Sequence, residues 1–121
     1  MTTKAVADRY YELAKQKKRM EIMEELYSKD IVNREPEHTI AMGIPTVTKG
    51  LDAVKAKGKA RAAMIEEIHN EFCSEPVVGG NFFSVGLGRD ITFKGKPRMS
   101  LEEIAVFEVK EGKIVSEQFF Y

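Results

Sequence analysis

The sequence has only one cysteine, no net charge and no long apolar run. Because Cys73 is the only cysteine, no disulfide can form within the chain. Nineteen basic and nineteen acidic residues cancel to a formal net charge of zero, so the composition offers no electrostatic argument for binding nucleic acid or an anionic membrane. No stretch approaches the roughly 20 apolar residues that a membrane-spanning helix needs. Any partner must therefore be argued from local features of the chain.

A signal peptide is also missing from the amino-terminal residues. Residues 1–4, Met-Thr-Thr-Lys, do not begin an apolar core. Together with the single cysteine, this predicts a reducing, cytoplasmic location. With 121 residues and an apolar fraction of 43%, the chain is long enough to bury a core but leaves no room for a second domain. We therefore expect one domain over residues 1–121.

Helical periodicity dominates the first half of the chain. Thr2 or Thr3 can cap a first helix that runs to about Lys17, and a second, shorter helix carries an apolar stripe over residues 22–27. A third helix follows Gly50. Its basic residues are expected to form a solvated helix face, mostly pointing outward; they are Lys55, Lys57, Lys59 and Arg61.

Extended segments make up the remainder. One strand runs from Ile31 to Glu35 and is closed by Pro36, which offers no ladder donor. Residues 37–49 predict a loop or irregular hairpin that could cover a cavity. The second half of the chain predicts four strands, at about 67–75, 81–93, 99–109 and 113–121. Together these elements predict an α+β cone-shaped half-barrel, in which three N-terminal helices pack on a curved, mixed, mainly antiparallel sheet.

The last hairpin sets which side chains face the interior of that cone. Gly112 suits the left-handed position of a three-residue loop with a G1 bulge, which places Val109 opposite Lys113. The concave face then carries Leu101, Glu103, Ala105, Phe107, Val115, Glu117, Phe119 and Tyr121, and the convex face carries Ile104, Val106, Ile114, Ser116, Gln118 and Phe120. Because both faces are largely apolar, both need a cover. We expect helices and a ligand on the concave face, and a second subunit on the convex face.

One strand offers an unusual lack of bulk. Ser84, Gly86 and Gly88 occupy every second position within residues 81–93, so they share one face of this strand and leave it nearly without side-chain bulk. The gap either widens the cavity or lets another backbone approach.

Four short segments resemble the SnoaL-like branch of the nuclear transport factor 2-like superfamily. They are Arg9-Tyr10-Tyr11, the run from Leu26 to Val32 with Glu35-Pro36, Lys49-Gly50-Leu51-Asp52-Ala53-Val54, and Glu111-Gly112-Lys113-Ile114-Val115. The resemblance spans nearly the whole chain and implies the cone fold with a ligand pocket. Most of these residues mark turns and element boundaries. The superfamily includes isomerases, cyclases, hydrolases and proteins that bind without catalysing, so the fold does not select a reaction.

The steroid isomerase branch of this superfamily implies roles for particular residues. There, a tyrosine of the first helix donates a hydrogen bond to an enolate, an aspartate before a proline acts as the base, and a protonated acid completes the oxyanion hole. By resemblance, Tyr10 matches the tyrosine and Glu35, which precedes Pro36, matches the base. The position of the third acid falls at about Ala105, so that role has no counterpart. Tyr10 could equally be a core residue.

Further candidates for acid-base chemistry come from the strand pattern. Glu103 and Glu117 are expected to be diagonal neighbours on an apolar wall, where loss of hydration would raise the pKa of at least one carboxyl group. Alternatively, Glu103 is solvated at the strand end and Glu117 pairs with a basic residue. His38 lies three residues after Glu35 and could pair with it, or could be a surface histidine. The expected ligand contacts are Phe107, Phe119, Tyr121, Ile40 and Met42.

Metal chemistry is not predicted. His38 and His69 lack the paired spacing of a helical metal site. His69, Glu71 and Cys73 share one face of a strand, but neighbours there lie about 6.6 Å apart, too far for one ion without bending. We therefore predict no metal and no cofactor.

Two hypotheses remain open. The first is a pocket protein that binds a small, mostly apolar molecule and isomerises, cyclises or hydrolyses it by carboxylate acid-base chemistry. The second is a non-catalytic dimeric module that binds a ligand or a protein. Whether the chain is an enzyme is not decided by its sequence.

Overall fold

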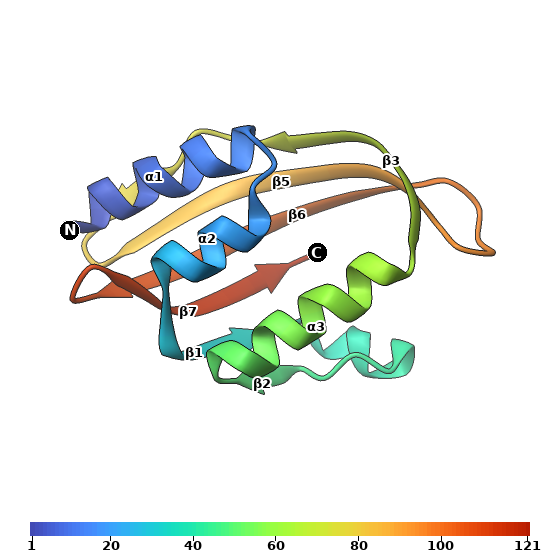
Figure 1. The fold of residues 1–121 in the computed structure, drawn as a ribbon, viewed down its shortest axis with the longest axis horizontal. Helices are drawn as coiled ribbons and strands as arrows, with labels where there is room; N and C mark the ends of the chain where they lie inside the picture. The colour runs from blue at the N-terminus through green and yellow to red at the C-terminus, as the bar shows by residue number, and fades with distance from the viewer.

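The helices of the computed structural model, which describes residues 1–121, lie along one side of a long sheet (Figure 1). They are α1 (Thr3–Lys15), α2 (Arg19–Leu26) and α3 (Leu51–Ala63), with a short 3-10 helix η1 (Glu37–Met42). The three predicted α-helices are confirmed, and Thr2 caps α1 by accepting a 3.1 Å hydrogen bond from the Ala5 backbone amide. The first helix ends before Lys17, which adopts a left-handed φ of 61°.

The sheet has seven strands in the order β2-β1-β7-β6-β5-β3, with β4 pairing on β5. Their bounds are β1 Tyr27–Arg34, β2 Val47–Lys49, β3 Ile65–Cys73, β4 Val77–Gly79, β5 Phe82–Phe93, β6 Met99–Lys110 and β7 Lys113–Phe120. Only β1 and β7 pair in parallel; the other pairs are antiparallel. The predicted mixed, mainly antiparallel sheet is therefore confirmed. The short strand β2 lies in the segment expected to be a loop or irregular hairpin, and the short strand β4 was not predicted.

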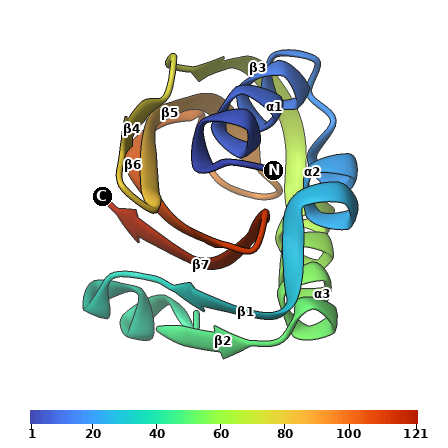
Figure 2. The same ribbon diagram turned by 90° about the vertical axis from the view of Figure 1, so that its left-hand side faces the viewer.

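The sheet curves partway around α1, and α2 and α3 lie along the side that the strands leave open (Figure 2). Odd-numbered residues of β5 and β6 face this interior, where Phe83, Val85, Ala105, Phe107 and Val109 are buried. They pack against the apolar stripe of α1, whose buried members are Val6, Ala7, Tyr10 and Leu13. The half-barrel predicted from the sequence is confirmed. None of its helices has the length and apolar character that crossing a membrane would require.

The hairpin between β6 and β7 differs from the prediction. Lys110 pairs with Lys113, so the loop contains only Glu111 and Gly112, with φ of 50° and 74°. Two residues at positive φ characterise a type I′ turn rather than a three-residue loop. The bulge lies further along, because Val109 pairs with Ile114 whereas Glu108 pairs with Ser116.

This bulge corrects the predicted register. Ile114 is fully buried instead of lying on the convex face, and Phe107 pairs with Glu117 instead of Val115. Glu103 and Phe107 are four residues apart on β6, about 13 Å at the usual rise of a strand. Glu103 and Glu117 are therefore not diagonal neighbours.

Candidate functional site

Glu117 is a buried carboxyl group held between two strands. Its strand, β7, pairs in parallel with β1, and this register sets Asn33 directly beside Glu117. The Asn33 amide donates a 2.8 Å hydrogen bond to Glu117 Oε1, and the Tyr27 hydroxyl donates to Oε2. Only 4% of Glu117 is exposed. Burial raises the pKa of Glu117, although the bonds from Tyr27 and Asn33 and the charge of Lys57 act in the opposite direction.

Lys57 connects this carboxyl group to a second one. From α3, its ammonium group donates to Asn33 Oδ1 at 2.6 Å and to Glu35 Oε1 at 3.1 Å. The other oxygen of Glu35 accepts a 2.8 Å bond from the Tyr121 hydroxyl. Burial, followed by the neighbouring Glu35, raises the pKa of Tyr121 to about 12. Tyr121 thus remains protonated and available as a hydrogen-bond donor at neutral pH.

A continuous hydrogen-bonded series results, which we call the carboxyl network: Tyr27, Glu117, Asn33, Lys57, Glu35 and Tyr121. It joins β1, β7 and α3 inside the cone. Chemically, it combines a carboxyl group that holds its proton unusually tightly with a carboxylate paired to a lysine. Such a pair of environments is one way for a protein to supply both an acid and a base at one pH.

Of the predicted site residues, the structure brings Glu35, Glu117 and Tyr121 together. Glu103 lies elsewhere on the concave face, half-buried, and burial raises its pKa while the charge of Arg61 lowers it. Phe119 is partly buried against the hydrophobic core. His38 is exposed, and its ring packs edge-on against Tyr121 at 5.3 Å between centroids, without a hydrogen bond to Glu35.

Tyr10 and Phe107 belong to the hydrophobic core. Their ring centroids lie 4.8 Å apart, and Phe83 packs against both, at 5.7 Å from Tyr10 and 4.7 Å from Phe107. Burial raises the pKa of the Tyr10 hydroxyl well beyond its usual range. Tyr10 is therefore a core residue, which is one of the two alternatives left open by the sequence. It takes part in none of the hydrogen bonds of the carboxyl network.

Ile40 and Met42 do not cover the interior. They lie on η1 with 64% and 61% of their surfaces exposed. In η1 it is Thr39 that turns inward, where its hydroxyl donates to the Pro36 carbonyl at 2.7 Å. The expected position of these two apolar residues over the cavity is therefore corrected.

Three members of the carboxyl network, Tyr27, Asn33 and Lys57, were not predicted from the sequence. Lys57 was expected to point outward, yet it lies three residues after the buried Val54 and four before Arg61. This 3-4 spacing puts all three on one helix face. This spacing could have identified Lys57 from the sequence, but the many basic residues of this helix favoured the interpretation of a solvated face.

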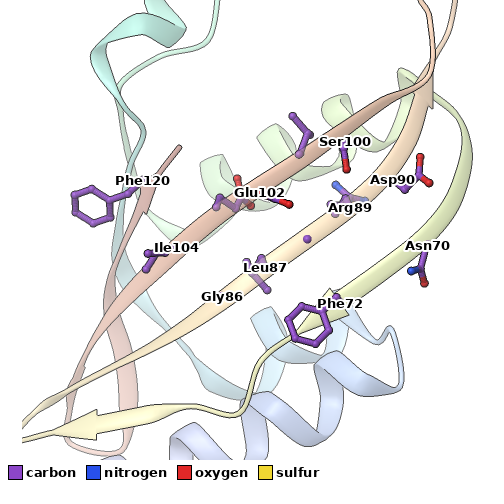
Figure 3. A pocket seen from close by; sticks show the side chains of 13 residues that line it. Asn70, Phe72, Gly86, Leu87, Arg89, Asp90, Ser100, Glu102, Ile104 and Phe120 are labelled. Carbon is purple, nitrogen blue, oxygen red and sulfur yellow. The ribbon is translucent and has the colours of Figure 1, made fainter.

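An open groove lies on the convex face, with a volume of about 600 Å³ (Figure 3). Gly86 and Gly88 form its floor, while Phe72, Ile104 and Phe120 project around it. The nearly bare face of β5 therefore opens on the convex side and does not widen the interior. On the metal question, the structure contains no group of three or more histidine, cysteine or acidic side chains arranged to hold an ion.

Comparison with known families and structures shows that proteins with this fold are already known. The family model described as SnoaL-like domain matches residues 1–121. A Mesorhizobium loti protein described as a SnoaL-like polyketide cyclase superposes with a TM-score of 0.91 and 29% identity, covering 100% of both chains. An NTF2-like protein of unknown function from Burkholderia pseudomallei gives a TM-score of 0.79 at 19% identity, covering 100% of this chain and 92% of its own.

A third structure is more distant. A Catenulispora acidiphila protein with a ketosteroid isomerase-like fold, in complex with trimethylamine, gives a TM-score of 0.67 at 18% identity, over 83% of this chain and 72% of its own. At this identity the likeness concerns the fold alone. Comparison with curated proteins found no match.

Proposed function

This chain belongs to the SnoaL-like domain family, and we propose that it binds a small, mostly apolar molecule inside the cone and exchanges a proton with it. The family and fold suggest ligand binding or a cyclase- or isomerase-type function. Supporting the proposal is the carboxyl network, which buries two glutamates of different environment in one interior. A carbonyl-bearing or ring ligand suits an apolar interior with a hydroxyl donor such as Tyr121.

The roles follow from accessibility and charge. Glu35 accepts hydrogen bonds from Tyr121 and Lys57 and is the proposed base. Tyr121 is half-buried next to it and is the proposed hydrogen-bond donor to the ligand, with its single hydroxyl proton turning from Glu35 to the ligand once the ligand is bound. Glu117, deeper and with a raised pKa, is the proposed proton reservoir. No metal or cofactor is required for this chemistry, because proton transfer next to a carbonyl needs only a base and a donor.

The exchange of protons next to a carbonyl group tests this proposal directly. A panel of cyclic ketones of increasing apolar size can be followed by NMR for replacement of those protons by deuterium in D2O. We expect the protein to accelerate exchange and Glu35→Gln to slow it by about a hundredfold or more. Glu37→Gln, an exposed neighbour, is the matched control. Binding of a ketone without any exchange would contradict the enzymatic proposal.

A non-catalytic binding module is the second candidate. All four carboxylate oxygens of Glu35 and Glu117 already accept hydrogen bonds from the protein. This arrangement also serves to fix β1, β7 and α3 relative to one another. The same ketone panel separates the two candidates, because a binding module would shift the resonances of the interior and leave the rate of exchange at the solvent value.

We also propose that the convex face pairs with a second copy of this chain. Around the groove, large apolar residues are exposed: Phe72 by 63%, Ile104 by 54% and Phe120 by 49%. Phe82, an even-numbered residue of β5, is also exposed on this face. Such a patch on one face is typical of an association surface. A stable interface needs roughly 1,000 Å² or more of buried area.

Phe120→Asp should then abolish association, because the interface would bury an unpaired charge. Light scattering should give a dimer mass for the wild-type protein and a monomer or aggregate for the variant. Ile40→Asp, at an exposed apolar residue of η1 that does not belong to the sheet, should remain dimeric. A stable wild-type monomer would exclude this association.

A further inference from the structure

The concave face carries a second group of charged side chains, distinct from the carboxyl network. Arg89 on β5 and Arg19 at the start of α2 both contact one oxygen, Glu71 Oε1, at 3.2 and 3.4 Å. Glu71 pairs with Arg89 across β3 and β5, so both project from the same face of the sheet. A single carboxylate thus serves two guanidinium groups, and it can neutralise only one of them.

Arg61 adds a third cation to this group. It lies in the last turn of α3, and its guanidinium carbon is 5.9 Å from the centre of the Phe93 ring. Arg61 forms no salt bridge, and neither does Glu103, the other acidic residue of this region. We refer to Arg19, Arg61 and Arg89 as the arginine cluster.

Positive charge in the arginine cluster is incompletely balanced. Burial is the main cause of a lowered pKa for Arg89, and the positive charges of Arg19 and Arg61 add to it. Glu103 is the second acidic group near these arginines, but it forms no salt bridge with any of them. Three guanidinium groups therefore face two carboxyl groups, of which only Glu71 forms salt bridges with the cluster. The Arg89 side chain is only 10% exposed and Arg61 is half-buried, and cations in such surroundings attract an anion.

We propose that the arginine cluster binds an anionic group, such as a carboxylate, at one end of the ligand that occupies the cone. This inference rests on the proposed interior ligand and specifies its chemical class: apolar in the middle and anionic at one end. A guanidinium offers two parallel donors that match the two oxygens of a carboxylate. The cluster also lies near the network, because Arg61 is close enough to Tyr121 to act against the rise in the pKa of that hydroxyl. An anion at Arg61 would thus set the rest of the ligand beside Tyr121 and Glu35.

A matched pair of probes tests the inference. 2-Naphthoate and 2-naphthamide have nearly the same shape and apolar area, but only the first is an anion at neutral pH. Titrations followed by NMR should show both probes shifting interior resonances, including those of Tyr121 and Phe93. We expect naphthoate to bind at least tenfold more tightly, with an affinity that falls as salt is added.

Arg61→Gln should reduce the affinity for naphthoate at least fivefold and leave that for naphthamide unchanged. Lys59→Gln is the matched control, because it removes the same charge from the exposed side of the same helix. Equal loss in the two variants would reduce the effect to general charge and overturn the inference. Equal affinity of the wild-type protein for both probes would overturn it too, while leaving the interior site intact. If neither probe shifts the interior resonances, both the inference and the proposed interior site are overturned.

Discussion

Phe107→Ala should lower the free energy of unfolding by about 3–5 kcal/mol. The Phe107 side chain is fully buried, and its ring packs at 4.7 Å from Phe83 and 4.8 Å from Tyr10, measured between centroids. Removing the ring loses its transfer free energy. It also leaves a cavity between α1, β5 and β6, which these elements can fill only in part by moving closer together. Urea unfolding monitored by circular dichroism measures this loss.

Met42→Ala is the control for this experiment, because it also truncates a large apolar side chain. Met42 is 61% exposed on η1 and does not belong to the hydrophobic core. Its truncation should change the free energy of unfolding by less than about 0.5 kcal/mol. Equal losses in the two variants would mean that Phe107 is not in a packed core.

The Phe107→Ala substitution should also disturb the packing around the carboxyl network. Phe107 pairs directly with Glu117 across β6 and β7. The side chains of such a pair are about 5 Å apart at Cβ, so the Phe107 ring packs beside the Glu117 side chain. The core and the proposed site are therefore coupled through one cross-strand pair.

Periodicity predicted the larger part of this fold. Spacings of three and four residues in α1, and the alternation of odd and even positions between the two faces of β5 and β6, mark the faces that the structure buries. These patterns depend on neighbouring residues only, and a single sequence contains them in full. The parallel pairing of β1 with β7 depends on contacts between segments more than 80 residues apart, which no local pattern specifies.

The register of the last hairpin could not be predicted from the local sequence. Gly112 at positive φ suits both a two-residue and a three-residue loop, so the sequence did not choose between them. The choice and the bulge after Val109 together decide which residue faces Phe107. A β-branched residue, Val115, takes the unpaired position, and nothing in its side chain indicates this. One undetermined residue in the turn was enough to misplace Ile114.

The carboxyl network was only half predicted for a related reason. Glu35 was identified by its place before Pro36, through the resemblance to the steroid isomerase branch, and Glu117 was identified as an acidic residue on an apolar strand face. Tyr27, Asn33 and Lys57 are ordinary in their local sequence, and they become notable only when β1, β7 and α3 meet. A buried carboxyl group such as that of Glu117 is stable only when it has hydrogen-bond partners. This requirement does not indicate which segment of the chain provides them.

Glu117→Gln should change how stability depends on pH. Burial raises the pKa of Glu117, so the folded protein holds a proton that the unfolded chain releases above its own pKa of about 4.3. The contribution of this group to stability is complete below the unfolded-state pKa and is lost as the pH rises through the folded-state pKa. Glutamine cannot ionise, so the variant avoids this loss.

The hydrogen bonds of the network tolerate that replacement. In the structure Tyr27 and Asn33 each donate to one oxygen of Glu117. In the protonated acid the oxygen next to Tyr27 can instead donate to the Tyr27 oxygen, and the amide nitrogen of glutamine can take that place while its carbonyl accepts from Asn33. At low pH the variant should therefore match the wild-type protein closely. As the pH rises, the variant should gain relative stability of about 1.4 kcal/mol for each unit between the folded- and unfolded-state pKa values.

Urea unfolding between pH 4 and pH 8 measures the difference, and carbon-13 NMR of the Glu117 carboxyl group gives the folded-state pKa independently. Glu24→Gln, an exposed replacement on α2, controls for the loss of one negative charge and should run parallel to the wild-type protein. If Glu117→Gln also runs parallel, the folded-state pKa of Glu117 is not raised and the carboxyl group is ionised at neutral pH. An ionised Glu117 would be a structural anchor for Tyr27 and Asn33, and the binding-module candidate would then account for the network better than proton transfer.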